Sequence, residues 1–164
     1  MPYSTEFLDS VIKAYDIRGL VDSQLTSTLA HDVGTLFAQQ VKSTVVVGED
    51  MRPSSPQLAD AFASGVMEQG FDVIRIGLAS TDQLYFASGY LNLPGAMFTA
   101  SHNPAEYNGI KLCRAGAAPV GKESGLTQIR DGLLEELPAI TSDLGSTTSR
   151  DVLLDYVNHL QSLV

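Results

Sequence analysis

The chain has 164 residues, of which 44% are hydrophobic and 18% charged, a composition that can fill the core of one globular domain. Its 10 basic and 19 acidic residues give a formal net charge of −9, which argues against binding to nucleic acid or to an anionic membrane. No apolar run approaches the roughly 20 residues of a membrane span, and the single cysteine excludes an internal disulfide. Since the N-terminus does not resemble a signal peptide, we expect a cytoplasmic protein.

Short β-rich runs alternate along the chain with amphipathic helical segments. In chain order, the spacing predicts a helix around residues 29–37, a strand at 44–48, a helix around 58–66, a strand at 73–77, a helix at 82–89, strands at 96–100 and 109–114, and a helix at 122–137. This alternation predicts a three-layer α/β/α fold. Its sheet is expected to be mostly parallel but mixed, with about four strands flanked by helices.

The last part of the chain is expected to form a loop and a helix. Residues 138–148 are small and polar, which predicts a loop, and residues 148–151 fit a helix capping box. An apolar stripe then runs from Val152 almost to the end of the chain. We therefore divide the chain into a domain at residues 1–140 and a linker with a C-terminal helix at residues 141–164. The stripe would suit packing against a following domain.

The most informative polar stretch follows the predicted strand at 96–100. Residues 99–104 read Thr-Ala-Ser-His-Asn-Pro, and residues 108–111 read Asn-Gly-Ile-Lys. Ligands of open α/β sheets bind beyond the carboxyl ends of strands, which places Ser101 where chemistry is favoured. A plain turn is the alternative, because Ser, Asn and Pro are turn formers. Lys111 is either on a solvated face of its strand or a point charge for phosphate.

Two further stretches have similar positions and similar ambiguity. Residues 13–19 read Lys-Ala-Tyr-Asp-Ile-Arg-Gly, so Arg18 either belongs to a strand and turn or offers a planar fork to phosphate. Residues 48–56 contain Gly-Glu-Asp-Met-Arg between a strand and a helix, a usual place for an anion site. Ser54 or Ser55 would equally serve there as a simple helix cap. The Gly-rich nucleotide fingerprints are absent.

Together these three stretches, in this order, resemble the first domain of the α-D-phosphohexomutases, on the phosphomannomutase/phosphoglucomutase branch. The resemblance runs from about Phe7 to the end of the chain. It implies that the full enzyme interconverts hexose 1-phosphate and hexose 6-phosphate, with hexose phosphates as substrates. The serine of Ser-His-Asn-Pro carries a phosphoryl group in this family, and a hexose 1,6-bisphosphate serves as intermediate and activator.

The resemblance also implies roles for individual residues. Ser101 becomes the phosphoryl carrier, with His102 and Asn103 beside it. Lys111 is implied as a phosphate contact and candidate general base. Tyr15 and Arg18 are implied at the rim of the active site, where Arg18 is both a catalytic and a substrate-binding candidate. Arg52 is implied as a further substrate-binding residue near the same cleft.

The family pattern is incomplete in this chain. Mg²⁺ is implied as the cofactor, but only the phosphate on Ser101 would be available here as a ligand, since the Asp-Gly-Asp-Gly-Asp metal loop is missing. The sugar-binding loop is missing as well. The partners implied are therefore hexose phosphates and further domains of the same protein, and we expect the isolated chain to be inactive as a mutase. Alternatives are a stand-alone module that binds phosphosugars or a protein partner without catalysis, or a generic α/β domain.

Overall fold

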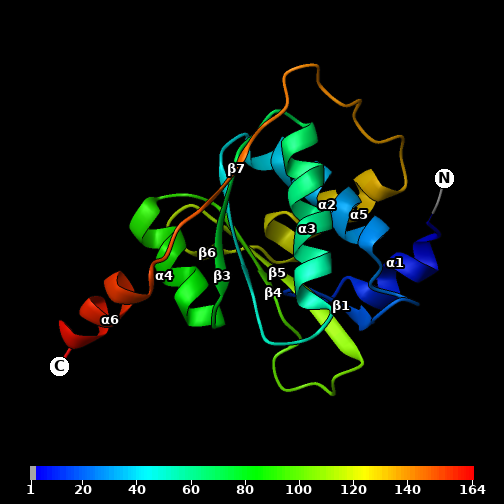
Figure 1. Cartoon of the computed structure of the whole chain (residues 1–164). Helices are drawn as coiled ribbons and strands as arrows, with labels where there is room; N and C mark the ends of the chain where they lie inside the picture. Colours follow the sequence, from blue (N-terminus) through cyan, green and yellow to red (C-terminus); the bar gives the residue numbers. More distant parts are fainter. Residues whose placement is uncertain (1–2) are drawn as a thin grey trace.

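The computed structural model describes residues 3–164 and is built around one mixed sheet between two layers of helices (Figure 1). The strands are β1 (Ile17–Leu20), β2 (Val45–Glu49), β3 (Val73–Leu78), β4 (Gly95–Phe98), β5 (Tyr107–Arg114), β6 (Ala118–Pro119) and β7 (Thr147–Ser149). The helices are α1 (Thr5–Val11), α2 (Ser27–Val41), α3 (Ser55–Glu68), α4 (Thr81–Leu91), α5 (Leu126–Leu133) and α6 (Leu153–Gln161), with a 3₁₀ turn at Lys122–Ser124.

The strand order explains why the sheet is mixed. Six of its seven strands follow the order β1-β5-β4-β2-β3-β7, and the short β6 pairs with β5 beside this path. Strands β4, β2, β3 and β7 run parallel to one another, whereas β5 runs antiparallel to both β4 and β1. The predicted α/β class with helices on both faces is therefore confirmed, and the sheet is larger than the four strands expected.

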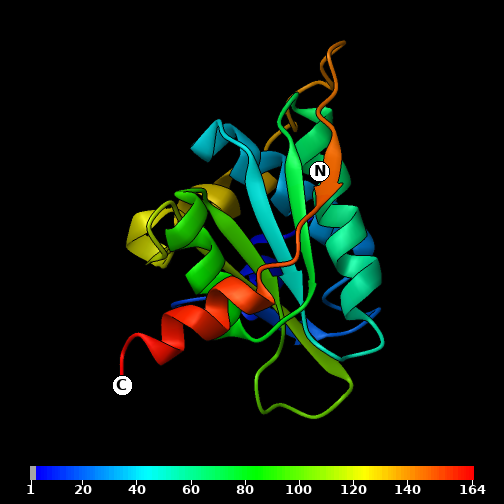
Figure 2. The same ribbon diagram turned by 60° about the vertical axis from the view of Figure 1, so that its left-hand side comes forward.

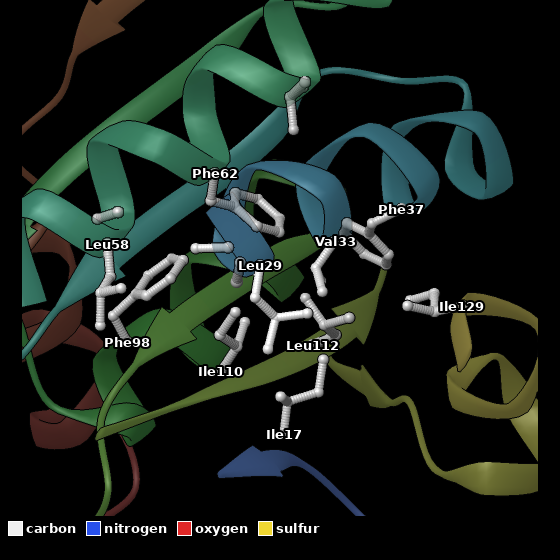
Figure 3. Close-up of a cluster of buried hydrophobic side chains, with 14 of the residues drawn as sticks. Ile17, Leu29, Val33, Phe37, Leu58, Phe62, Phe98, Ile110, Leu112 and Ile129 are labelled. Carbon is white, nitrogen blue, oxygen red and sulfur yellow. The ribbon is translucent and has the colours of Figure 1, made fainter. Parts of the chain in front are cut away.

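The larger core lies on the face covered by α1, α2, α3 and α5. The stripe of α2 that the sequence indicated, from Leu29 through Val33 to Phe37, is fully buried there. Figure 3 shows these side chains packed with Phe62 of α3 against the sheet residues Phe98, Ile110 and Leu112. Packing is close: a Cβ on Gly34 of α2 would stand 2.2 Å from the carbonyl oxygen of Phe62.

The smaller core lies on the opposite face, under α4. It contains Val46, Met97 and Cys113 of the sheet with Leu84 of α4. Helix α6 packs beside α4 rather than on the sheet, as the second view shows (Figure 2). The apolar stripe expected here is largely exposed: Leu153, Leu154, Val157 and Leu160 of α6 and Leu163 just after it are all exposed.

Three predicted elements differ from the structure. The helix expected at 122–137 is a 3₁₀ turn followed by the short α5, because Gly125 interrupts it with a φ of +152°. The loop expected at 138–148 ends in β7, which covers the exposed edge of β3. The capping box expected at 148–151 does not form, since the buried Val152 is the N-cap and makes no side-chain cap.

Candidate active site

Two loops meet where the neighbouring parallel strands β2 and β4 end. Val47 pairs with Ala96, and the register continues to Glu49 and Phe98, so both strands end at the same edge of the sheet. The segment at residues 99–106, here called the serine loop, projects beyond this edge and is visible as the lime-green loop in both ribbon views (Figures 1 and 2). The structure therefore brings the Ser-His-Asn-Pro stretch and the Gly-x-Asp-x-Arg stretch together.

Ser101 is exposed and has an unusual backbone conformation. Its φ is +55°, in the left-handed region that non-glycine residues seldom adopt. The backbone is held there from both sides: the amide of Ser101 donates to the hydroxyl of Thr99 at 3.0 Å, and the amide of Asn103 donates to the carbonyl of Ala100 at 3.0 Å. Such conformations cost on the order of 1–3 kcal/mol and collect at functional sites, because the surrounding structure must maintain them.

Arg52 holds the serine loop from inside. Its guanidinium is buried, and its two terminal nitrogens donate to four backbone carbonyls of one short segment. These carbonyls belong to Ser101 (3.0 Å), Asn103 (2.7 Å), Pro104 (2.7 Å) and Tyr107 (3.0 Å). The remaining Nε–H donates to Asp50 at 3.2 Å, so all five N–H donors of Arg52 have protein partners.

A buried polar network supports this arrangement. Asp50 accepts from the hydroxyl of Ser55 at 2.6 Å, at the first turn of α3. The fully buried Asn108 donates to the hydroxyls of Ser54 and Ser55 at 2.8 and 2.9 Å, and thereby ties the start of β5 to the start of α3. The serine at position 54 is the N-cap residue of α3 by position, but it makes no side-chain cap. Its hydroxyl serves the loop network instead.

A cluster of charges lies beside the serine loop on β1 and β5. The carboxylate of Asp16 accepts from Arg18 at 2.7 Å and from Lys111 at 3.1 Å, both through the same oxygen, Oδ2. The other end of the Arg18 guanidinium donates to the side-chain oxygen of Asn103 at 2.8 Å. The structure thus places Arg18, Lys111 and Asn103 in one connected site, although they come from two separate stretches of the sequence.

Strand alternation explains the direction of these side chains. Ile110 and Leu112 face the larger core, so Lys111 between them projects from the opposite face. Ile17 faces the same large core, which sends its neighbours Asp16 and Arg18 to the side of Lys111. Lys111 is thus neither on a freely solvated face nor in the core, since its side chain is one-fifth exposed.

Gly109 allows β1 to approach this site closely. It pairs with Arg18, and a Cβ added to it would lie 2.7 Å from the carbonyl oxygens of both Ile17 and Thr99. Contacts below 3.0 Å with backbone atoms cannot be relieved by rotating a side chain. The glycine of the Asn-Gly pair is therefore required by close packing within the sheet and not by a hairpin turn.

Two predicted site residues do not join the charge cluster. His102 is exposed on the serine loop. Tyr15 is also exposed, and it lines a pocket of about 490 Å³ together with Lys122, Glu123 and Ser124. Both side chains are free to meet a ligand from solvent, whereas Arg18 and Lys111 are already engaged.

The sequence interpretation missed the acidic and amide residues that organise the site. Asp16 and Asp50 lie inside two of the motifs, but the motifs alone predict no role for them, and the Asn-Gly pair at Asn108 indicates only a turn. The spacing of Asp16 and Arg18 held a usable signal, because residues two apart on a strand share a face. The contacts of Asp50 with Arg52 depend on the folded conformation of this loop, so the sequence alone does not predict them.

The single cysteine is not part of this chemistry. Cys113 follows Lys111 by two residues on β5 but is buried in the smaller core. Burial raises the pKa of its thiol, and hydrogen bonds with Ser88 and Gly95 offset this only in part. A buried, protonated thiol is a poor nucleophile.

The described residues hold no cluster that would bind a metal by itself. Across residues 3–164, no three His, Cys, Asp or Glu side chains gather with the geometry of a metal site. In the same part of the chain, no helix is both long enough and apolar enough to span a bilayer.

Comparison with known proteins shows which family this chain resembles in sequence and in fold. The chain is 41% identical over 160 residues to a phosphomannomutase of Vibrio cholerae, which covers 93% of this chain and 34% of that protein. It is 40% identical to a phosphomannomutase of Klebsiella pneumoniae, with 89% of this chain and 96% of that sequence covered. The fold matches a crystal structure of a phosphoglucomutase/phosphomannomutase family protein from Burkholderia thailandensis with a TM-score of 0.78 and 30% identity, over 97% of this chain and 36% of that one.

The chain thus spans about a third of the length of the Vibrio relative and of the Burkholderia structure. Residues 9–137 match the α/β/α domain I of phosphoglucomutase/phosphomannomutase. This match covers most of the chain and includes the serine loop, Arg52 and the charge cluster. The protein belongs to the phosphoglucomutase/phosphomannomutase family, and its described fold is that family's domain I.

Proposed function

We propose that this chain is the phosphoserine domain of an enzyme that interconverts hexose 1-phosphate and hexose 6-phosphate. The observation that carries the proposal is the state of Ser101, which is exposed and in a left-handed conformation on a loop whose carbonyls are held by Arg52. Family membership supports the reaction class, because relatives that share 40–41% identity with this chain are phosphomannomutases. Interconversion of the two phosphates is an isomerase reaction.

The proposed reaction consists of two phosphoryl transfers, each of which moves a different phosphoryl group. The phosphoryl group on the Ser101 oxygen passes to the free hydroxyl of the hexose monophosphate, breaking the bond to Ser101 and forming a hexose 1,6-bisphosphate. The bisphosphate, which is also the proposed activator, then returns its other phosphoryl group to Ser101. Arg18 and Lys111 hold phosphoryl oxygens as cations. Lys111 in its neutral form is the candidate to take the proton of the attacking hydroxyl and to pass it to the departing Ser101 oxygen. Phosphoryl transfer depends mainly on positioning and on neutralising charge.

Local charge supports this assignment. Arg18, Arg52 and Lys111 bring three positive charges and Asp16 and Asp50 bring two negative ones, so the site carries a formal +1 in a chain of −9. A phosphoserine adds about −1.5 to −2 charge and needs such cations. Since every donor of Arg52 already has a protein partner, we propose that Arg52 maintains the loop and that Arg18, Lys111 and Asn103 contact the phosphate. Tyr15 and His102 contact substrate from the rim.

Magnesium is the proposed cofactor of the complete enzyme. Within residues 3–164 no set of protein ligands fits the ion, so a phosphate on Ser101 would be the only contribution from this chain. The phosphoryl-transfer steps proposed for this chain involve only its own side chains and the hexose phosphate. For the same reason, and because the chain spans a third of the Vibrio relative, we propose that these residues alone do not turn over hexose phosphates. Further domains of the same protein, hexose phosphates as substrates and a cytoplasmic location belong to this proposal.

A chimera tests the proposed function. Residues of this chain would replace the matching region of the Vibrio cholerae phosphomannomutase, and conversion of mannose 1-phosphate to mannose 6-phosphate would be measured. We expect activity in the chimera and its loss by about three orders of magnitude or more in Ser101→Ala. The matched control is Ser64→Ala, which changes a serine on α3 that bonds only within its helix. A folded chimera with equal activity before and after Ser101→Ala would contradict the proposal.

A further inference from the structure

One carboxylate oxygen joins the two cations of the site. Oδ2 of Asp16 lies 2.7 Å from Nη2 of Arg18 and 3.1 Å from Nζ of Lys111, and Asp16 is only 7% exposed. The Arg18 guanidinium continues to Asn103 of the serine loop at 2.8 Å. A chain of hydrogen bonds therefore runs from Lys111 through Asp16 and Arg18 to the loop that carries Ser101.

The physics of this cluster gives Asp16 two possible effects that oppose each other. Arg18 and Lys111 carry like charges on long flexible side chains, and without a shared anion they repel each other and move apart into solvent. A carboxylate between them holds the guanidinium of Arg18 and the ammonium group of Lys111 in place, at a small cost in side-chain entropy. However, the same carboxylate also neutralises part of the charge that a phosphate on Ser101 would meet.

We propose that Asp16 is a positioning residue that holds Arg18 and Lys111 together, directed at the phosphate on Ser101. The inference rests on the proposed function, because it takes Ser101 as the phosphoryl carrier. The geometry favours positioning over simple charge compensation for two reasons. A single oxygen serves both cations, which sets their separation, and Arg18 is held at its other end by Asn103.

The test compares the stabilisation that phosphorylation brings in different variants. The 164-residue chain is made with serine or with phosphoserine at position 101, and urea unfolding is measured for both at about pH 8, where the phosphate is a dianion. A chelator removes metal ions. The quantity of interest is the increase in the urea midpoint caused by the phosphate. If Asp16 only stabilised the fold, its substitution would lower the urea midpoints of the serine and phosphoserine forms equally and leave this increase unchanged.

Asp16→Asn is the main variant because it keeps the size of the side chain and removes its charge. If Asp16 positions the cations, the phosphate-dependent increase falls by about half or more in Asp16→Asn. An unchanged or larger increase would overturn the proposal, because a carboxylate that merely competes with the phosphate gives that result. The matched control is Asp22→Asn, which removes the same charge from an exposed residue with a φ of +67° that asparagine tolerates.

A second variant covers the case in which Asp16→Asn folds poorly. Asp16→Glu keeps the charge but displaces it by one methylene, and the proposal expects it to lose the phosphate-dependent increase as well. An Asp16→Glu chain with the full increase would show that charge alone matters and would overturn the inference. Failure of the proposed function has a separate signature: the unsubstituted chain would gain nothing from the phosphate, and Arg18→Gln and Lys111→Gln would change nothing.

Discussion

Replacing Arg52 by methionine tests whether the serine loop depends on one buried side chain. The guanidinium donates to four carbonyls of residues 101–107 and to Asp50, whose side chain is only 10% exposed. Methionine fills similar space but leaves the carboxylate of Asp50 without its cation. Removing one partner of a buried ion pair costs about 3–5 kcal/mol. For a chain of this size, that loss lowers the melting temperature by about 6–20 °C.

Two measurements separate a loop effect from a general loss of stability. Equilibrium urea unfolding gives the change in free energy, and hydrogen exchange of residues 101–107 under native conditions reports on the loop itself. We expect Arg52→Met to accelerate exchange in this loop far more than in β2 or α2. The matched control is Arg75→Met, because Arg75 makes two ion pairs of 2.7 Å, with Glu49 and the exposed Asp60, and neither partner belongs to the serine loop.

The control variant should lose about 1 kcal/mol or less and leave exchange in the serine loop unchanged, as expected for a partly exposed ion-pair network. If Arg52→Met destabilised the chain no more than Arg75→Met, or left loop exchange unchanged, the reasoning that Arg52 maintains the loop would be refuted.

Two further predictions concern packing and pH. Gly109→Ala should lower the free energy of unfolding in urea by about 1–3 kcal/mol, because the new Cβ meets two backbone carbonyl oxygens at 2.7 Å. The control Gly89→Ala, which has open space around it on α4, should leave the stability unchanged or raise it. Equal losses in the two variants would contradict the close approach at Gly109. Burial lowers the pKa of His31, but hydrogen bonds to Asp32 (3.0 Å) and Glu68 (2.7 Å) outweigh it, so the pKa is raised. A raised folded-state pKa gives stability that is fully present below about pH 6.5 and is lost as pH rises through the folded value. The free energy of unfolding in urea should therefore decline from about pH 6 to 8, and the decline should be smaller in Glu68→Gln. Identical pH profiles for the unsubstituted chain and Glu68→Gln would exclude the His31–Glu68 pair as the cause.

Much of the fold was predictable because its strands and helices carry strong local patterns. The β-branched run of β2 is buried on both faces, and the stripe of α2 follows a helical period, so both elements stand out in the sequence. The 3-residue strand β7 was not predictable. It is exposed, has no periodicity to detect, and forms because β3 offers it an unpaired edge. The interruption of the helix expected at 122–137 depends on the conformation of Gly125, which only the folded chain shows.

The candidate site was predictable as a set of loops and only in part as a set of contacts. Ser101, Arg18 and Lys111 could be selected because their motifs resemble a known family and stand near strand ends. The inward orientation of Arg52 could not, since it depends on four carbonyls of a loop about 50 residues away. The role of Asp16 depends likewise on β1 pairing with β5, a contact between segments that are far apart in sequence.

The most direct test of the central claim is to find where the phosphoryl group resides. The chimera would be incubated with hexose 1,6-bisphosphate and Mg²⁺, quenched, digested and mapped by mass spectrometry, with Ser54 and Ser55 of the same site as internal controls. The account predicts one added phosphoryl group, on Ser101, and its loss when hexose monophosphate is supplied. Turnover with Ser101 unmodified throughout, or with the group on another residue, would contradict it.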